Sequence, residues 1–355
     1  VIRIESQIGI YSHVVLTRLF DNHGFGSKRA TQLFVERIKS LDLDIVHIHN
    51  IHGYYINVEV LFKYLKRQQK PVVWTLHDCW AFTGHCTHFD YVECDRWRNE
   101  CHNCPQWRNY PSSVLFDNSK RNYQRKKTIF NSLDGMILVT PSKWLAGKVS
   151  ESFLSKYPVK VIYNGIDLDV FKPVKSIFRE RNNLVDKVIL LGVANVWDSR
   201  KGLEDFIELS KHLTDDYRII LVGLTDKQMR NLPANIIGIK RTNDINELAS
   251  IYSTADLFLN LSVEETMGLT TVEALACGTP AVVYNCTALP EVIDESSGIV
   301  VEKRNLRNII HTIDSGFYTR FKKEDCIRRA MKFDQKRMFC DYIELYSSIV
   351  SPEVR

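Results

Sequence analysis

Short apolar runs rich in β-branched residues alternate with longer stretches in which apolar residues recur every three or four positions, from about residue 44 onward. The short runs are typical of buried strands, and the longer stretches are typical of helices that pack one face on a sheet. This alternation predicts parallel strands with helices on both faces. In the first half of the chain it predicts strands within 44–50, 71–78, 135–142 and 159–167, and a helix over 57–69.

The same alternation starts again after residues 167–173, which read DLDVFKP and are typical of a linker. It predicts strands within 187–195, 217–224 and 256–262, a short apolar segment near 235–239, and helices over 201–213 and 244–255. We therefore predict an α/β fold of two Rossmann-like, doubly wound parallel-sheet domains that face each other across a cleft. Their predicted limits are 1–167 and 168–355, with the last helix, about 333–350, packing back on the first domain.

The first forty residues do not follow this alternation. A nucleotide-binding α/β domain usually opens with a buried strand and a tight Gly-rich turn, and residues 1–34 offer neither cleanly. The segment from Leu19 is predicted as a loop, followed by an amphipathic helix from about Ser27 to Leu41.

Composition narrows the class of protein. The chain has 355 residues, of which 45% are apolar, so two domains can each bury a core. The net charge of +5 suits an anionic small molecule or an anionic membrane surface, but is too small to indicate nucleic acid. No apolar run approaches the roughly 20 residues of a membrane span, and the first residues lack a signal-peptide pattern. We therefore expect a cytoplasmic protein whose nine cysteines are thiols or metal ligands.

Polar side chains follow the predicted strands, where ligands bind in open parallel sheets. The first domain places His49, Asn50, His77, Asp78, Ser142, Asn164 and Gly165 there, and the second places Asn195, Gly223, Ser262 and Asn285. Asn, Asp, Ser and Gly are also common turn formers, so a purely structural role stays open for most of them. His77 directly after VVWTL has no turn-forming reason to be there.

Residues 262–285 combine two glutamates, Glu265 and Glu273, with Gly268 and a small-residue helix. One interpretation is structural: Thr270-x-x-Glu273 fits a capping box, which would start the helix near Thr270 or Thr271. The other is a ligand site, because a helix start attracts phosphate, and carboxylates can hold the hydroxyl groups of ribose or a hexose. Arg200 and Lys201, after the first strand of the second domain, would complement such a site.

The run EETMGLTTVEALACGTPAVV resembles the Glu-x7-Glu signature of the retaining, nucleotide-sugar-dependent glycosyltransferases of family 4, which have the GT-B fold. YNGIDLDVFKP is similar to the segment before the interdomain linker of that family, and RKGLEDFI is similar to its Lys-Gly helix. DIVHIHN and TLHDCWAFTGHC resemble its first-domain strands, most closely those of bacterial capsule and O-antigen transferases.

The resemblance implies a role for each matching residue. Glu273 would hold the ribose, Glu265 the transferred sugar, and Lys201 with the backbone of the helix start the diphosphate. His77 would reach the sugar from the first domain, and the reaction would retain the anomeric configuration without a catalytic metal or other cofactor. The remaining donor-binding positions would be Gly268, Leu269, Thr270, Thr271, Arg200, Asn195, Asn164 and Gly165.

The chain departs from the family pattern at its start, where we expect the first strand and the Gly-rich loop to be missing. It also has one extra residue before Arg200, and CTALPE replaces the usual Gly-Gly before Glu291. The resemblance implies a saccharide or lipid-linked saccharide acceptor, with peripheral association at the inner face of the membrane, and no nucleic acid. Two alternatives stay open: a nucleotide-sugar epimerase of the same fold, or a non-catalytic partner that binds nucleotide or zinc in an assembly complex.

Residues 79–110 form a Cys-rich insertion in the first domain. Four cysteines that end in a Cys-x-x-Cys pair fit a structural zinc site, although the first pair is spaced more loosely than in zinc ribbons. The alternative is four reduced thiols in an inserted loop. The predicted zinc ligands are Cys86, Cys94, Cys101 and Cys104.

Overall fold

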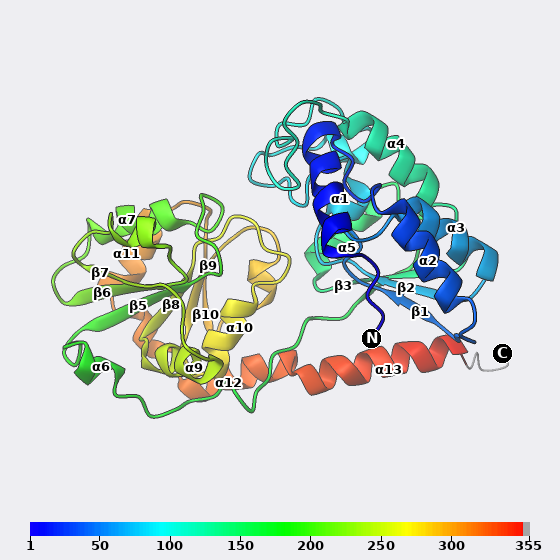
Figure 1. Ribbon diagram of the computed structural model, residues 1–355. Coiled ribbons are helices and arrows are strands. Elements are labelled where there is room, and N and C mark those ends of the chain that lie inside the picture. The colour runs from blue at the N-terminus through cyan, green and yellow to red at the C-terminus, as the bar shows by residue number, and fades with distance from the viewer. Residues whose placement is uncertain (351–355) are drawn as a thin grey trace. The chain divides into compact units, whose positions relative to one another are not determined.

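A computed structural model describes residues 1–350 (Figure 1). The chain divides into two compact units. Unit 1 consists of Val1–Ile162 and the end of the chain from Tyr342, and unit 2 consists of Tyr163–Asp341.

Unit 1 is built on a sheet of four parallel strands in the order β1-β2-β3-β4. Because the strands follow one another in sequence order, each connection crosses one face of the sheet and leads to the neighbouring strand. The strands are β1 Val46–Ile48, β2 Val72–Thr75, β3 Met136–Thr140 and β4 Val159–Val161. The helices are α1 Gln7–Phe20, α2 Lys28–Ile38, α3 Val58–Gln68, α4 Ser119–Phe130 and α5 Lys143–Ser150.

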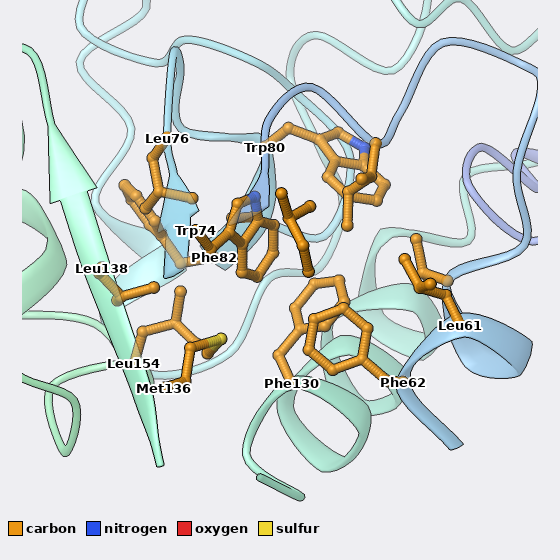
Figure 2. Close-up of a cluster of buried hydrophobic side chains, with 14 of the residues drawn as sticks. Leu61, Phe62, Trp74, Leu76, Trp80, Phe82, Phe130, Met136, Leu138 and Leu154 are labelled. Carbon is orange, nitrogen blue, oxygen red and sulfur yellow. The ribbon is translucent and has the colours of Figure 1, made fainter. Parts of the chain in front are cut away.

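Aromatic side chains from the sheet and its helices form the centre of the unit 1 core (Figure 2). Phe62 on α3 and Phe130 on α4 have ring centroids 4.8 Å apart, and Trp74 on β2 lies 4.9 Å from Phe130. Such tilted and edge-on ring contacts each contribute a little stability beyond that gained from burying the large apolar area of the rings. The core therefore fixes the ends of β1 and β2, where polar residues follow.

Helix α1 was not predicted, since the sequence pattern indicated no element over residues 7–18 and a loop from Leu19. Ser6 begins it as an N-cap whose hydroxyl accepts a hydrogen bond from the Gly9 amide, and Asp21 ends it with a left-handed φ of 50°. Its buried side chains are His13 and Thr17, which are polar. Apolar residues lie on several sides of the helix, with Ile10 and Val14 half-buried and Ile8 exposed, so no single apolar face indicates it in the sequence.

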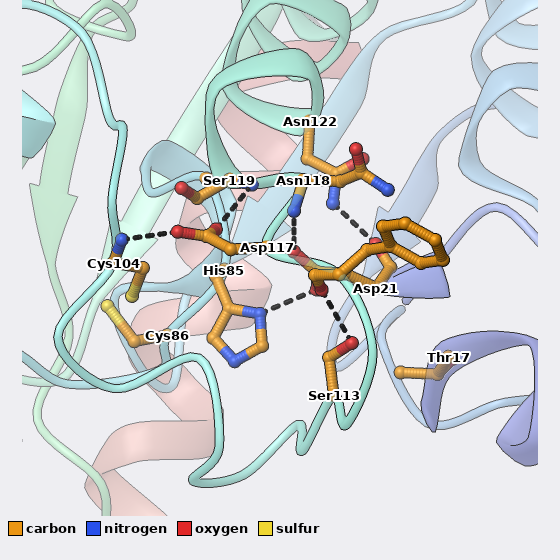
Figure 3. Close-up of polar contacts among 12 residues, drawn as sticks. Thr17, Asp21, His85, Cys86, Cys104, Ser113, Asp117, Asn118, Ser119 and Asn122 are labelled. Atoms are coloured by element: carbon orange, nitrogen blue, oxygen red, sulfur yellow. Dashed lines mark hydrogen bonds and ion pairs between the residues drawn. The ribbon is translucent and has the colours of Figure 1, made fainter. Parts of the chain in front are cut away.

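The loop between β2 and α4 is held by a buried polar network (Figure 3). The Asp21 carboxylate lies 2.6 Å from Nδ1 of His85 and accepts a hydrogen bond of 3.0 Å from the Asn118 amide. Asn122 on α4 donates to the Asp21 carbonyl oxygen. This loop contains only two short 3₁₀ turns, Trp80–Phe82 and Arg96–Arg98. Side-chain hydrogen bonds, rather than the backbone bonds of helices or strands, therefore hold it in place.

Unit 2 is built on a sheet of six parallel strands in the order β10-β9-β8-β5-β6-β7. The chain moves outward from β5 in one direction and then outward from β8 in the other, so β5 and β8 flank the topological switch point. The strands are β5 Val188–Val193, β6 Tyr217–Val222, β7 Ile236–Ile239, β8 Leu257–Asn260, β9 Ala281–Tyr284 and β10 Gly298–Val301.

The helices of unit 2 cover this sheet and include one that leads back into unit 1. Gln335–Val350 forms α13, which begins in unit 2 and belongs to unit 1 from Tyr342. Within residues 1–350 no helix is long and apolar enough to span a membrane. The other helices are α6 Phe178–Arg181, α7 Leu203–Ser210, α8 Asp226–Met229, α9 Ile245–Thr254, α10 Leu269–Ala276, α11 Leu306–Asp314 and α12 Lys323–Ala330.

Candidate functional site

Three loops meet at the carboxyl ends of the central strands of unit 2. They follow β5, β8 and β9, and backbone hydrogen bonds join them. The Val263 amide donates to the Arg200 carbonyl at 2.8 Å, and the Ala288 amide donates to the Glu265 carbonyl at 3.3 Å. The switch point is where open α/β sheets bind ligands, so this edge is the candidate site.

Two glycines make the close approach of these loops possible. Gly202 has a φ of 77°, and a Cβ atom there would lie 2.4 Å from the Leu261 carbonyl oxygen. Gly268 has a φ of 87°, and a Cβ atom there would lie 2.7 Å from the Leu289 side chain. Any other residue at either position would be strained and would push the loops apart.

Lys201 and Glu265 form an ion pair across the switch point. Nζ of Lys201 lies 2.5 Å from Oε1 of Glu265, and both side chains remain partly exposed. The Glu265 amide donates to the Thr287 hydroxyl at 3.1 Å, which holds the Glu265 backbone against the loop after β9. The structure thus places a cation and a carboxylate side by side at the switch point.

Arg200 is shared between two carboxylates that the sequence did not single out. Its Nη2 and Nε atoms contact the Asp198 carboxylate at 2.7 and 3.1 Å, and its Nη1 atom lies 3.6 Å from Glu264. Burial lowers the pKa of Arg200, but the Asp198 carboxylate outweighs it, so the net pKa is raised. A phosphate role for Arg200 stays a prediction, and here its charge is largely used within the protein.

Glu273 does not cap helix α10, so the capping-box interpretation was wrong. Helix α10 begins at Leu269 after Gly268, without a side-chain cap. The Thr271 side chain is buried and accepts a hydrogen bond of 3.0 Å from Asn260, so it is unavailable to the helix end. Glu273 instead accepts a hydrogen bond of 2.8 Å from the Tyr252 hydroxyl on α9. Burial raises the pKa of Glu273 to about 7, and the Tyr252 bond opposes that rise.

This raised pKa predicts a pH dependence of stability. Folded Glu273 holds a proton up to a pH of about 7, whereas its ordinary pKa is 4.5. Unit 2 should therefore become less stable as the pH rises from about 4.5 through 7. We expect Glu273→Gln to match the parent protein in melting temperature at pH 5 and to exceed it at pH 8, measured by calorimetry. A difference that does not change with pH would contradict the burial argument. The control is Glu208→Gln, which changes an exposed carboxylate on α7.

The other predicted donor-binding residues are only partly brought together. Leu269 and Thr270 occupy the first turn of α10 beside Gly268 and are partly exposed, and Asn195 is exposed after β5. Gly165 packs instead on the start of α13, where a Cβ atom would lie 2.3 Å from Cα of Gln335. This contact is a structural reason for the glycine, and the donor roles of Gly165 and its neighbour Asn164 stay predictions.

Unit 1 has its own small pocket at the carboxyl ends of β1 and β2, with both polar and apolar lining residues. His77 pairs with His49 through ring nitrogens 3.1 Å apart, and burial lowers the pKa of both. His52 lies 2.9 Å from the Asp78 carboxylate in the same pocket. The sequence placed His49, His77 and Asp78 after their strands, but it did not single out His52, the partner of Asp78. The predicted sugar contact of His77 stays a prediction.

The four predicted zinc ligands line one small cavity together with His85 and His102. The Cys86 and Cys104 thiols are hydrogen-bonded to each other, and Cys101 accepts a hydrogen bond of 3.2 Å from the Gly84 amide. Within residues 1–350, however, no group of three or more His, Cys, Asp or Glu side chains is arranged to hold a metal ion. The side chains as placed do not fit a metal, and the zinc site stays a prediction.

Comparison with known proteins agrees with the division of the chain. Residues 3–170 match the family described as Glycosyltransferase Family 4, and residues 187–315 match the family described as Glycosyl transferases group 1. The chain is 23% identical to the putative colanic acid biosynthesis glycosyl transferase WcaC of Escherichia coli K12, over 98% of this chain and 87% of that protein.

Two solved structures are similar in fold. Sucrose-phosphate synthase of Thermosynechococcus elongatus superposes with a TM-score of 0.67 at 20% identity, covering 90% of this chain and 78% of that one. HepE of Anabaena, solved in complex with UDP, superposes with a TM-score of 0.66 at 17% identity, covering 90% and 82%. At these identities the likeness concerns the fold alone.

Proposed function

Because the chain has the GT-B glycosyltransferase fold and carries a family 4 domain followed by a group 1 domain, we propose that it moves a hexose-type sugar from a nucleoside-diphosphate sugar to a saccharide acceptor. The acceptor class we propose is a lipid-linked saccharide used in bacterial surface polysaccharide assembly. The relative named for colanic acid biosynthesis supports the polysaccharide assignment. The Anabaena structure, a complex with UDP, supports a nucleoside diphosphate as the donor's leaving group.

The observation that carries this proposal is the Lys201–Glu265 pair at the switch point, beside the start of α10. A diphosphate is doubly anionic and fits a lysine next to the free amides of a helix start. A carboxylate binds sugar hydroxyl groups. Glu273, farther along α10, would hold the ribose through its second oxygen or after exchanging the Tyr252 bond.

In the proposed reaction, the bond between the anomeric carbon and the diphosphate oxygen breaks while the acceptor oxygen bonds to the same face of the sugar, and the acceptor hydroxyl gives its proton to the departing diphosphate oxygen. The leaving diphosphate takes up negative charge as the bond breaks. Lys201 and the α10 amides would stabilise that charge, and this is the kind of interaction that lowers barriers most. We propose that no metal ion is needed for this stabilisation, and that Glu265 orients the sugar without forming a covalent intermediate.

A thermal-shift experiment on the whole chain tests the proposal. We expect one of UDP, GDP, ADP or dTDP to raise the melting temperature of unit 2, because a ligand at about 100 times its Kd adds about 2.7 kcal/mol of stability. The preferred nucleotide identifies the donor class, and the matching donor sugars are then offered with membrane lipid extract. No shift with any nucleoside diphosphate would contradict the proposal. Conversion of donor to a different nucleotide sugar without acceptor would identify an epimerase instead.

A further inference from the structure

Two neighbouring strands of unit 1 place a row of polar side chains on one face of their sheet. Strands β1 and β2 are parallel, with His47 opposite Val73. Side chains two positions apart along a strand lie on the same face. His47 and His49 therefore share a face with Thr75 and His77. The row runs along both strands and ends just beyond their carboxyl ends.

Each member of this row contacts the next. Nε2 of His47 lies 2.8 Å from Oγ1 of Thr75, and the ring of His47 packs on that of His49 with centroids 4.1 Å apart. Nδ1 of His49 in turn lies 3.1 Å from Nε2 of His77. Burial lowers the pKa of both His49 and His77, so near pH 7 both rings are neutral and one donates to the other. This hydrogen bond fixes which nitrogen of His77 carries the proton.

Helix α13 holds the row at its other end. Tyr342 and Tyr346 are one turn apart, so they lie on the same face of the helix, and both belong to unit 1. The Tyr346 hydroxyl lies 2.5 Å from Nδ1 of His47, and the Tyr342 hydroxyl lies 2.9 Å from Oγ1 of Thr75. Both nitrogens of His47 are therefore used, and its ring cannot turn without the loss of a hydrogen bond.

Attachment of α13 to the sheet does not by itself require polar side chains. Helices usually pack on sheets through apolar residues, and polar groups at such a contact are costly unless each has a partner. Here the groups of His47 and Thr75 do have partners, but only in one arrangement of the rings. The polar row thus adds a fixed orientation, which passes from one side chain to the next as far as His77.

We propose that His49 is a positioning residue for His77, and that Tyr346 acts on His77 through His47 and His49. Because His49 holds Nε2 of His77, Nδ1 is the ring nitrogen left for the sugar. This inference rests on the proposed function and on the predicted sugar contact of His77. Helix α13 begins in unit 2, so the orientation of His77 would depend on the docking of a helix that the two units share.

NMR of the whole chain, labelled with isotope-enriched histidine, tests the positioning without any substrate. Couplings to the ring nitrogens show which nitrogen carries the proton, and the variant His77→Gln identifies the signals of His77 by their loss. We expect a single tautomer of His77 in the parent protein. His49→Phe keeps a ring on His47 but removes the nitrogens, so both tautomers of His77 should appear. His49→Asn, whose amide occupies the place of Nδ1, should restore a single tautomer.

Tyr346→Phe removes one hydroxyl group and should change the His77 signals in the same direction as His49→Phe. The matched control is Tyr157→Phe, which removes a buried hydroxyl that lies near two backbone carbonyls elsewhere in unit 1. It should leave the His77 signals unchanged even where it lowers the melting temperature. Unchanged His77 signals in His49→Phe would overturn the positioning role. A change confined to His47 in Tyr346→Phe would overturn the link to α13.

His49→Ala provides the same readout should His49→Phe fail to fold, since the His49 side chain is partly exposed. Turnover of the donor found by thermal shift then measures the consequence for the reaction. His49→Phe should lower kcat by about three- to tenfold, the range for the loss of one neutral hydrogen bond, and leave the KM for the donor unchanged. His49→Asn should recover most of kcat. An unchanged kcat in His49→Phe would overturn the role in the reaction. If the parent protein turns over no donor, the proposed function fails, whereas the NMR result still decides whether His49 positions His77.

Discussion

Lys201→Met is expected to weaken the binding of a nucleoside diphosphate by about a hundredfold. A hydrogen bond to a charged group contributes about 1.5–3 kcal/mol, and each 1.4 kcal/mol is a factor of ten in affinity. The loss should exceed that of one contact, because Lys201 also neutralises Glu265 at 2.5 Å. Without the lysine, the Glu265 carboxylate would repel the incoming diphosphate. Isothermal titration calorimetry with the nucleotide chosen by thermal shift measures the change directly.

Two further variants separate this electrostatic role from a general effect on unit 2. Lys211→Met removes another lysine of the same unit, which pairs with Glu208 at 2.7 Å on the exposed end of α7, and should leave affinity unchanged. Adding Glu265→Gln to Lys201→Met should recover part of the lost affinity, since the repulsion disappears. Unchanged binding in Lys201→Met would place the diphosphate elsewhere than between β5 and β8.

The fold class was predictable because parallel strands and covering helices leave two distinct periods in the sequence. That prediction is confirmed by the two parallel sheets and the GT-B structures they resemble. Helix α1 escaped prediction for a physical reason. Its apolar residues lie on several sides, with Ile10, Val14 and Leu19 half-buried and others exposed, so no single apolar face stands out in the sequence.

The location of the candidate site was also predictable, because strand ends and glycines are visible along the chain. The side chains with which the site residues pair were not predictable. Glu273 looked like a helix cap to a rule that considers only neighbours in sequence, whereas its hydrogen bond comes from Tyr252 on another helix. Arg200 likewise has a neighbour far along the chain, Glu264. The two residues lie close together only because the loops after β5 and β8 meet. Sequence therefore indicates which residues reach the site, and tertiary packing decides which of them pair.

Asp21→Ala is expected to lower the free energy of unfolding of unit 1 by about 3–5 kcal/mol, the range for removal of one partner of a buried ion pair. Asp21 and His85 are both almost fully buried and lie 2.6 Å apart. Burial lowers the pKa of His85, but the Asp21 carboxylate outweighs it, so the net pKa is raised. Without the carboxylate, that imidazole and the Asn118 amide would be buried without their partner.

Urea unfolding followed by tryptophan fluorescence measures this loss, because five of the six tryptophans lie in unit 1. Asp42→Ala is the matched control, since its pair with Lys70 at 3.3 Å is exposed and should contribute less than about 1 kcal/mol. In the double variant Asp21→Ala, His85→Ala the cost should be smaller than the sum of the single costs, because the charged partner is gone. Additive losses, or an Asp21→Ala effect no larger than that of Asp42→Ala, would show that the pair does not hold the loop between β2 and α4.

If the pair does hold that loop, hydrogen exchange in Asp21→Ala should rise first at the amides of residues 84–104, because few backbone hydrogen bonds of regular structure protect them.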